Sequence, residues 1–514
     1  MSPTQRVLVV DFGSQYTQLI ARRIREQHVY CEIVPPWIET DRIQEIAPRA
    51  LVLSGGPGSV NHADAPRPNE ELLELGIPTL GICYGMQLLV RHFGGRVEAA
   101  PEREYGRARL RVERPDDPLL VGVPRESVAW MSHGDRVTRL PESFEVLATS
   151  ENSPFAAVRQ RGRPCYGVQF HPEVVHTEAG GALVRNFLHR IAGLAGDWSM
   201  DEFIASQTEE IRQRVGDAEV ICGVSGGVDS TVVAALLRRA LGDRVHCLFV
   251  DTGLLRAGEA EEVERLFRRE LRIPLRVIDA RRHFLEGLQG IEDPEKKRVR
   301  VGHIFVEAFE SAARELPGAR FLAQGTLYPD VIESVSVWGP SATIKTHHNV
   351  GGLPERMQLA VLEPLRELFK DEVREVAEHL EIPRKLWGRH PFPGPGLAIR
   401  VLGEVSEERL AILREADRIV LEEIERAGVY DDLWQAFAVF LPVRTVGVMG
   451  DARSYEHVIA VRCVSSRDAM TADWAPLDPE LLGRISSRII NEVSGVNRVV
   501  YDISSKPPAT IEWE

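Results

Sequence analysis

The sequence predicts an α/β protein with two doubly wound parallel-sheet domains, followed by a small α+β domain at the C-terminal end. Residues 6–193 alternate short apolar runs, typical of buried strands, with amphipathic helical patterns. A second alternating unit runs from Glu219 to Ile278, and beyond about residue 400 helical and strand patterns mix. A chain of 514 residues is too long for one hydrophobic core, which favours three domains.

The elements follow in order along the chain. In the first unit we expect strands at Val7–Val10, Ala50–Leu53, Thr79–Ile82 and Tyr166–Phe170, with helices at Arg22–Gln27, Glu70–Leu75 and Met86–Phe93. A Gly-rich link at Ala192–Trp198 leads into a polar helix at Met200–Arg214. In the second unit we expect strands at Glu219–Val224, Val245–Val250, Leu275–Ile278 and Arg320–Ala323, with helices at Thr231–Arg239 and Ala260–Arg269.

The last part of the chain begins after a Pro/Gly-dense stretch, His390–Ala398, which marks a boundary or a rigid binding turn. Its expected helices are Glu407–Arg426 and Pro479–Val493, and its expected strands are Thr445–Met449, His457–Val464 and Arg498–Asp502. We therefore place the domains at residues 1–194, 199–393 and 394–514.

The composition limits the partners and the compartment. A net charge of −14 argues against a protein whose main function is to bind nucleic acid, although the basic cluster Lys296–Arg300 can bind small anions. The six cysteines form no C-x-x-C pair, which suits a reducing cytosol. The first expected strand begins at Arg6, and no apolar run approaches the roughly 20 residues of a membrane span. We expect a soluble cytoplasmic protein without a signal peptide and without membrane partners.

The first chemical motif is Gly81-Ile82-Cys83-Tyr84-Gly85 between an expected strand and an expected helix. A lone cysteine in this place is most often a small buried hydrophobe. The Gly-x-Cys-x-Gly frame, however, matches the nucleophile elbow, in which glycines allow a strained turn that lifts the nucleophile above the sheet. The pattern thus predicts a nucleophilic thiol at Cys83.

A thiol needs a base, and Val168-Gln-Phe-His171-Pro-Glu173 supplies one at the end of another expected strand. Because strand residues two apart share a side, Glu173 can orient the imidazole of His171. A glycine turn at Ser54–Gly58 also follows a strand and can donate a backbone N–H to an oxyanion.

These motifs together resemble the class I glutamine amidotransferase domains. The resemblance implies that Cys83 is the nucleophile, His171 the base and Glu173 the orienting acid. It also implies an oxyanion hole from the backbone of Gly56 and Tyr84, and a glutamine contact at Gln87. Met131–Asp135 resembles the family's substrate-lining loop, where His133 is either a substrate neighbour or an ordinary loop histidine.

The second motif, Ser225-Gly-Gly-Val-Asp-Ser230, lies between a strand and a helix, where N–H groups and the helix dipole favour phosphate. Glycines alone predict only a turn, and the Lys of a Walker A loop is missing. The motif resembles the PP-loop of ATP pyrophosphatases. This resemblance implies ATP binding by Ser225, Gly226, Gly227, Val228, Asp229, Ser230 and Thr231, with Asp229 also placing Mg²⁺. Gln324–Asp330 resembles the stretch near the nucleotide base and adds Gln324 and Gly325.

A PP-loop domain alone is compatible with RNA thiolation, NAD synthesis or argininosuccinate synthesis. A fused glutaminase narrows these choices because it delivers ammonia. Adenylation turns a carbonyl oxygen into a leaving group, and ammonia then attacks that carbon. The two motifs together therefore predict an ATP-dependent amidation that releases AMP and pyrophosphate.

The order of the three domains resembles the GMP synthase family from end to end. His390–Arg400, Gly450–Tyr455 and the tail Ser505–Glu514 also fit that family. The resemblance implies amination of XMP, with contacts from Arg298, Asp451, Arg453, Lys506 and Glu512. It further implies a homodimer through the C-terminal domain and a lid at Ile344–Asn349, with Lys345, His347 and His348 as its candidate residues. Without the resemblance, Lys506 and Glu512 are ordinary solvated tail residues and the lid is a polar loop.

Two alternatives remain open on the residues alone. One is a PP-loop amidotransferase that acts on another carbonyl, such as a nucleobase in RNA, which the acidic charge disfavours. The other is a nucleotide-sensing partner protein with degenerate sites. Intact Cys83, His171, Glu173 and Asp229 argue against a degenerate enzyme.

Overall fold

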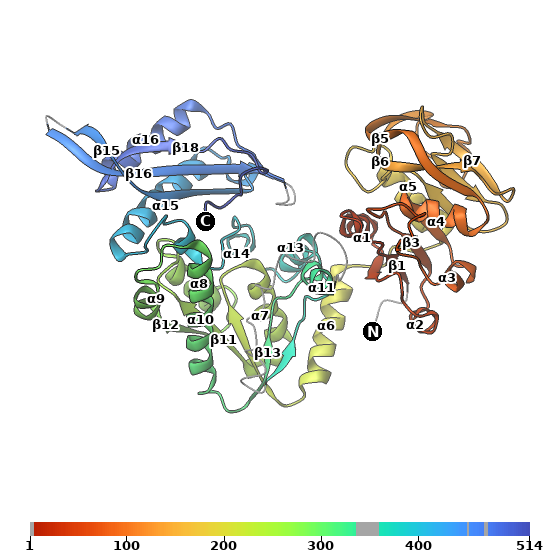
Figure 1. Cartoon of the computed structure of the whole chain (residues 1–514). Helices are drawn as coiled ribbons and strands as arrows, with labels where there is room; N and C mark the ends of the chain where they lie inside the picture. Colours follow the sequence, from red (N-terminus) through yellow and green to blue (C-terminus); the bar gives the residue numbers. More distant parts are fainter. Residues whose placement is uncertain (1–4, 336–358, 450–451, 467–470) are drawn as a thin grey trace. The chain divides into compact units, whose positions relative to one another are not determined.

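The computed structural model describes residues 5–335, 359–449, 452–466 and 471–514. Chain packing divides it into two compact units, shown in Figure 1. The first unit comprises residues 1–206 and 328–345, and the second comprises residues 207–327 and 346–514. The lid candidates Lys345, His347 and His348 and the XMP candidate Asp451 lie outside the described residues.

Within the described residues, the first unit contains a nine-stranded sheet in the order β2-β1-β3-β4-β9-β8-β7-β5-β6. Strands β2, β1, β3, β4 and β9 run parallel, and the remaining strands pair antiparallel. Their bounds are β1 (Arg6–Val10), β2 (Tyr30–Val34), β3 (Ala50–Leu53), β4 (Thr79–Ile82), β5 (Arg96–Val112), β6 (Glu126–Arg139), β7 (Phe144–Thr149), β8 (Ala157–Gln160) and β9 (Cys165–Val168). The parallel strands are buried along their whole length, apart from their end residues and part of β2.

The helices of the first unit are α1 (Thr17–Arg25), α2 (Thr40–Ile46), α3 (Glu70–Glu74), α4 (Tyr84–His92), α5 (Gly180–Arg185), the π-helix Asn186–Ile191 and α11 (Tyr328–Val335). Of these, α1 and α4 pack buried apolar side chains against the sheet. Helix α1 begins earlier than the expected Arg22 because Ile20, Ala21 and Ile24 form one buried face. Helix α6 (Met200–Val215) leads from the first unit into the second.

The second unit begins with a five-stranded parallel sheet in the order β12-β11-β10-β13-β14, counted over the described part of the chain. The strands are β10 (Glu219–Val224), β11 (Val245–Asp251), β12 (Leu275–Asp279), β13 (Ala319–Ala323) and β14 (Ala360–Leu362). Its helices are α7 (Val228–Leu241), α8 (Glu259–Arg269), α9 (Arg281–Leu288), α10 (Pro294–Ala313), α13 (Lys370–His379) and α14 (Arg384–Trp387). Strand β10 coincides with the expected strand, and the PP-loop motif follows at its carboxyl end.

The C-terminal part of the second unit has a sheet of β15 (Gln435–Met449), β16 (Ala452–Ser465), β17 (Asp473–Trp474) and β18 (Val496–Tyr501). Strands β15 and β16 form the long antiparallel ribbon at the blue end of the colour scale in Figure 1. Helices α15 (Glu407–Arg426) and α16 (Pro479–Glu492) pack on one face of this sheet. A single hydrophobic core joins these helices to the parallel sheet, with members such as Leu248, Phe284 and Leu413.

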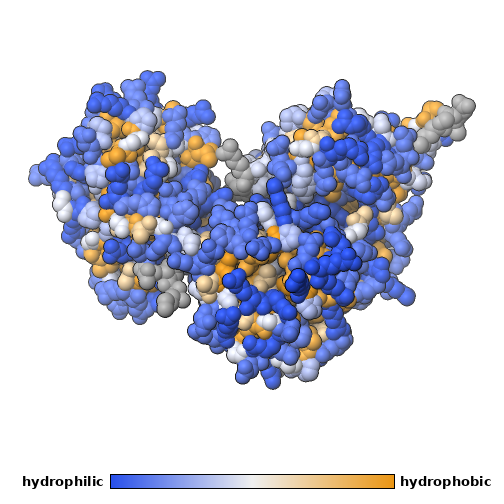
Figure 2. Space-filling view, turned by 180° about the vertical axis from the view of Figure 1, so that it is seen from behind, coloured by the Kyte–Doolittle hydropathy of each residue, from blue (hydrophilic) through white to orange (hydrophobic). Residues whose placement is uncertain are grey.

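The surface is mostly hydrophilic. Figure 2 shows one face of the molecule, on which hydrophobic residues form scattered patches among hydrophilic ones. Among the helices of the described residues, none combines the length and the apolar content needed to cross a membrane.

Candidate active sites

Cys83 occupies a strained turn between β4 and α4. Its backbone angles are φ 49° and ψ −103°, a region that residues with a side chain rarely adopt. The flanking glycines are required by close packing: a Cβ on Gly81 would lie 2.6 Å from the backbone nitrogen of Met86, and one on Gly85 would collide with the Leu53 carbonyl. The turn therefore has the geometry that the Gly-x-Cys-x-Gly pattern predicts.

His171 and Glu173 form a buried pair beside Cys83. His171 Nδ1 lies 2.7 Å from Glu173 Oε1, and the two residues are 3% and 1% exposed. Burial lowers the pKa of His171, but the Glu173 carboxylate and a hydrogen bond with Cys83 outweigh that effect. The pKa of His171 consequently lies well above its usual value. The arrangement favours an imidazolium that faces the sulfur, the state in which a thiolate is stabilised.

Gly56 and Tyr84 supply backbone N–H groups near the thiol. Among the hydrogen bonds of the described residues, neither N–H has a backbone acceptor. A Cβ on Gly56 would lie 2.9 Å from Cγ of the Tyr84 ring, so only glycine fits there. The Tyr84 hydroxyl donates to the Pro66 carbonyl at 2.7 Å, which fixes the ring. The oxyanion role of these two N–H groups stays a prediction.

The side chains of Gln87 and Gln169 lie next to the turn that carries Cys83. The side-chain amide of Gln87 donates to the Asp135 carbonyl at 2.9 Å and lies 3.3 Å from Gln169 Oε1. Gln169 Nε2 in turn lies 3.7 Å from Cys83 Sγ. Gln169 was not among the predicted site residues, although its position directly before Phe170 and His171 was a usable signal.

The stretch Met131–Asp135 is part of strand β6 and is not a loop, so that expectation was wrong. Alternating burial along β6 shows a half-buried antiparallel strand with a period of two. The stretch still reaches the thiol, because the Ser132 carbonyl lies 3.8 Å from Cys83 Sγ. His133 is buried, and its Nε2 lies 3.2 Å from Glu104 Oε2.

The PP-loop motif closes on itself between β10 and α7. Ser225 N–H donates to Ser230 Oγ at 3.1 Å, and Thr231 Oγ1 donates to the Gly227 carbonyl at 2.8 Å. Gly226 has φ 79°, and a Cβ there would lie 2.9 Å from Val263. Val228 begins α7, so the loop directly precedes the N-terminus of that helix. This geometry suits an anion such as pyrophosphate.

Asp229 is the acidic centre of this site. Its Oδ2 pairs with the ammonium of Lys370, the first residue of α13. Its Oδ1 is buried and has no hydrogen-bond partner among the described residues. A carboxylate oxygen in that state fits a hard cation such as Mg²⁺. Lys370 was missed because sequence spacing gives no sign that α13 meets α7.

The predicted nucleotide-base stretch Gln324–Asp330 is divided by the structure. A Cβ on Gly325 would lie 3.2 Å from the Asp229 Cβ, and Gln324 N–H donates to the Leu362 carbonyl at 2.9 Å. Tyr328, by contrast, is buried in the first unit, where its hydroxyl accepts from the Ile33 N–H. Gly325 thus lies beside Asp229 of the PP-loop, and Gln324 lies between it and β13.

The C-terminal tail is docked. Glu512 accepts two hydrogen bonds from the fully buried Arg400, at 3.0 and 2.8 Å. The Glu514 side chain pairs with the fully buried Lys297, and its carbonyl accepts from Arg298. Lys506 forms an antiparallel backbone bridge with Ala472. Arg298, Lys506 and Glu512 therefore belong to one region of the second unit, and the tail is not a frayed end.

Arg453 lies elsewhere. It is exposed near the start of β16, opposite Val448 in β15. The tail docks at the other end of β16, where Arg462 donates to the Thr510 carbonyl at 3.1 Å. At about 3.3 Å per residue, roughly 30 Å of strand separate Arg453 from Arg462. One copy of the chain does not bring Arg453 together with Lys506 and Glu512.

Three family models match the chain. The glutamine amidotransferase class-I model matches residues 8–191, the NAD synthase model matches residues 201–294, and the GMP synthase C terminal domain model matches residues 422–513. The first match contains the Cys83 site, the second contains the PP-loop, and the third contains Arg453 and residues 505–513 of the tail.

Relatives match over the full length. The GMP synthase [glutamine-hydrolyzing] of Aquifex aeolicus is 57% identical over 508 residues, which are 99% of both chains. That of Phenylobacterium zucineum is 57% identical over 515 residues, again 99% of both chains. That of Solidesulfovibrio magneticus is 56% identical over 517 residues and 100% of both chains. With the two sites described above, these matches establish that the chain belongs to the family of glutamine-hydrolysing GMP synthases.

Proposed function

We propose that the chain makes GMP from XMP, ATP and glutamine in two half-reactions, one at each strand-to-helix turn. The observation that carries this proposal is the presence of a thiol site and a PP-loop site in one chain. Cys83, His171 and Glu173 are assembled in the first unit. The PP-loop and Asp229 are assembled in the second.

The first half-reaction releases ammonia from glutamine. The Cys83 sulfur attacks the side-chain amide carbon, and the oxyanion is bound by the N–H groups of Gly56 and Tyr84. His171 passes the thiol proton to the leaving nitrogen, so ammonia departs and a thioester remains. Water then attacks the thioester carbon while His171 takes a proton from the water. The carbon–sulfur bond breaks, His171 passes that proton to the sulfur, and glutamate leaves. Glu173 keeps the imidazole oriented throughout.

The second half-reaction activates XMP with ATP. A carbonyl oxygen of the XMP base attacks the α-phosphorus of ATP, an adjacent ring nitrogen loses its proton, and pyrophosphate leaves from the PP-loop. Ammonia attacks the carbon of the resulting adenyl-XMP, the carbon–oxygen bond breaks, and AMP and a proton leave. Ser225, Gly226, Gly227, Val228, Ser230 and Thr231 are the proposed phosphate-binding residues, and Gln324 and Gly325 adjoin them.

Asp229 would hold Mg²⁺ through its unpartnered oxygen. The ion would neutralise negative charge on the phosphates when bound. Among the described residues, no group of three His, Cys, Asp or Glu side chains could hold a metal by itself. The cation would therefore take its other ligands from phosphate oxygens and water.

We infer that the XMP site uses Arg298, Asp451, Arg453, Lys506 and Glu512, and that the enzyme is a homodimer through its C-terminal domain. Support comes from the exposed apolar side chains Val446, Val448 and Tyr455, which are 45%, 78% and 62% exposed on paired strands β15 and β16. In a homodimer, the second copy of the chain would also supply an Arg453 to the first copy. Sedimentation of the native chain and of Val448→Asp tests the dimer, because a buried charge should dissociate it.

We further propose that residues 1–194, 199–393 and 394–514 act as glutaminase, ATP pyrophosphatase and dimerisation parts. Lys345, His347 and His348 are proposed as the lid that closes over the nucleotide. The partners are small molecules and not nucleic acid or a membrane, and the compartment is the cytoplasm. Support comes from the net charge of −14 and from six free, buried cysteines.

Incubation with ATP, Mg²⁺, glutamine and XMP tests the proposal. AMP, pyrophosphate and glutamate should appear in equal amounts, with a shift in purine absorbance. Leaving out XMP should stop AMP formation. AMP formation that requires RNA and ignores XMP would favour an RNA-modifying amidotransferase, and no turnover at all would favour a nucleotide sensor.

A further inference from the structure

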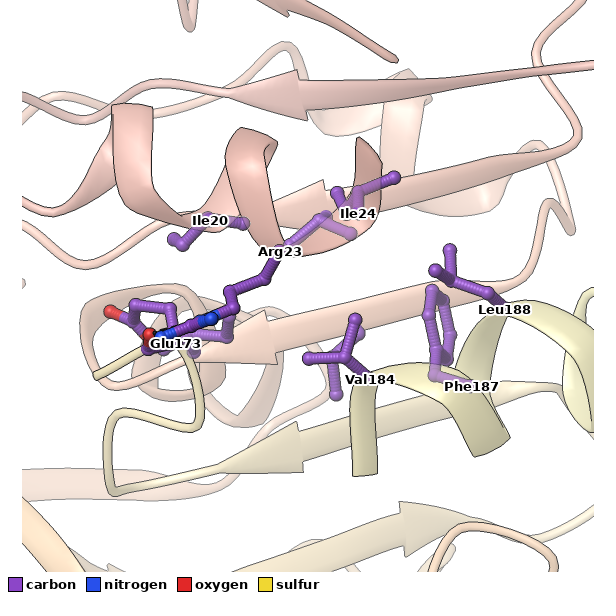
Figure 3. A pocket seen from close by; sticks show the side chains of 10 residues that line it. Ile20, Arg23, Ile24, Glu173, Val184, Phe187 and Leu188 are labelled. Carbon is purple, nitrogen blue, oxygen red and sulfur yellow. Dashed lines mark hydrogen bonds between the residues drawn. The ribbon is translucent and has the colours of Figure 1, made fainter. Parts of the chain in front are cut away.

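Arg23 on α1 reaches the loop that carries the catalytic acid. Its Nε donates to the Glu173 carbonyl at 2.8 Å, and its Nη1 donates to Glu26 Oε2 at 2.6 Å. Figure 3 shows the Arg23 side chain extended from α1 toward Glu173 beside a small apolar cavity. The space in that cavity within which the centre of a water molecule fits is about 10 Å³. This volume is too small for a ligand. Arg23 is therefore a bridge between two elements and not a part of a further pocket.

The two members of the base–acid pair are held in different ways. The backbone of His171 is held by two hydrogen bonds. The His171 N–H donates to the carbonyl of Trp130 in β6 at 2.9 Å, and the His171 carbonyl accepts from Thr177 Oγ1 at 2.7 Å. The backbone carbonyl of Glu173 is held by Arg23 from α1. The carboxylate of Glu173 has one oxygen on His171 and one buried oxygen without a hydrogen-bond partner in the described part of the chain.

Helix α1 also meets the imidazole itself. The Tyr16 ring, at the helix N-cap, contacts the His171 ring edge-on, with the centroids 5.1 Å apart. Between Tyr16 and Arg23, one short helix thus borders both His171 and Glu173. Because a helix is a rigid element, its contacts can fix the relative orientation of the two side chains.

We propose that Arg23 is a positioning residue for glutamine hydrolysis, which holds the Glu173 peptide so that its carboxylate stays aimed at His171. This inference rests on the proposed glutaminase function of Cys83. Arg23 acts through Glu173 only. Its side chain is 24% exposed, so it is not fully buried.

Four variants of the full-length chain test this role. Arg23→Ala should lower the kcat of glutamine hydrolysis about tenfold or more, with KM for glutamine little changed, because a small misplacement of a catalytic group costs turnover. Arg23→Lys should restore part of the rate, since an ammonium can donate one hydrogen bond. Glu26→Ala removes the partner of Nη1 and should leave kcat near the native value. Arg42→Ala is the matched control, because Arg42 forms an i,i+3 pair with Glu45 on α2.

A second readout separates positioning from general structure. Alkylation of Cys83 by iodoacetamide, followed by mass spectrometry of its peptide, reports the reactive thiolate directly. In Arg23→Ala the rate at neutral pH should fall and recover at higher pH, and synthesis from added ammonium salt should be unchanged. An equal loss with ammonium salt, or a Glu26→Ala loss as large as that of Arg23→Ala, would overturn the assignment.

Different results would show that the role of Arg23 is wrong and that the proposed glutaminase function is wrong. Native kcat and a native alkylation profile in Arg23→Ala, together with no hydrolysis in Cys83→Ala, would refute the role of Arg23 and leave the glutaminase intact. A native chain that does not hydrolyse glutamine would refute both.

Discussion

The Lys370 ammonium pairs with the Asp229 carboxylate and thereby joins the first turn of α13 to the first turn of α7. The pair uses one carboxylate oxygen and leaves the other buried without a hydrogen-bond partner among the described residues. The proposed Mg²⁺ partner and a lysine ammonium thus lie side by side at the PP-loop. The role of Asp229 was implied by the resemblance of the motif, whereas Lys370 could not be read from the motif.

Asp229→Ala should lower pyrophosphate release strongly with either glutamine or ammonium salt, because the proposed Mg²⁺ partner is lost. Lys370→Ala should also lower it and should raise KM for ATP, since the ammonium would no longer meet the phosphates. Pyrophosphate assays at saturating XMP measure both effects. An unchanged rate in Asp229→Ala would remove the PP-loop assignment.

The elbow glycine Gly85 should tolerate no side chain. In Gly85→Ala the new Cβ would press on the Leu53 carbonyl, and overpacking of this kind costs about 1–3 kcal/mol. The melting temperature and the glutaminase rate should both fall. Gly181→Ala is the control, because a Cβ there meets no atom within 4 Å. A native melting temperature for Gly85→Ala would contradict the described close approach.

The pH dependence of thiol reactivity should depend on Glu173. The pKa of His171 is raised well above its usual value, although burial opposes the rise, because Glu173 and Cys83 stabilise the imidazolium. The protonated form therefore persists to higher pH in the native protein. In Glu173→Gln the pKa of His171 should fall, so the imidazolium is lost at lower pH and Cys83 alkylation at neutral pH slows. Identical alkylation profiles for both proteins would mean that Glu173 does not charge the imidazole.

Lys506 should serve XMP binding and leave the glutaminase unaffected. Lys506→Ala should raise KM for XMP and leave glutamine hydrolysis unchanged, because Lys506 lies in the second unit. The exposed Lys385 on α14 provides a control substitution to Ala. Equal KM values for XMP in the two variants would exclude Lys506 from the site. Deletion of residues 505–514 is a poorer test, because the buried Arg400 would lose Glu512.

The sequence was most informative where burial is complete. The bounds of the parallel strands β1, β3, β4 and β10 were predicted to within a residue or two. A short continuous apolar run bounded by turns is compatible with few elements other than a buried strand. Strands β5 and β6 were missed because one face of each carries polar residues, and arginines and glutamates mask the alternation. The α+β character of the last domain followed from its mixed patterns.

Site residues could be predicted where they lie in a short sequence motif. Cys83 and Asp229 lie in short motifs whose backbone geometry is fixed by nearby glycines. Lys370 and Arg23 escaped prediction because each acts across distant segments, and spacing along the chain carries no record of such contacts. Gln169 was overlooked although it lies two residues before His171. Arg400 escaped for a related reason: an arginine is rarely fully buried, and its burial depends on a carboxylate far along the chain.

The nitrogen source for GMP synthesis in Cys83→Ala tests the account most directly. This variant removes the proposed nucleophile of the first unit and leaves the PP-loop, Asp229 and the docked tail unchanged. With ATP, Mg²⁺ and XMP, added ammonium salt should support GMP formation at close to the native rate, and glutamine should support none. Loss of GMP formation with both nitrogen sources, or continued formation with glutamine, would contradict the assignment of two separate half-reactions.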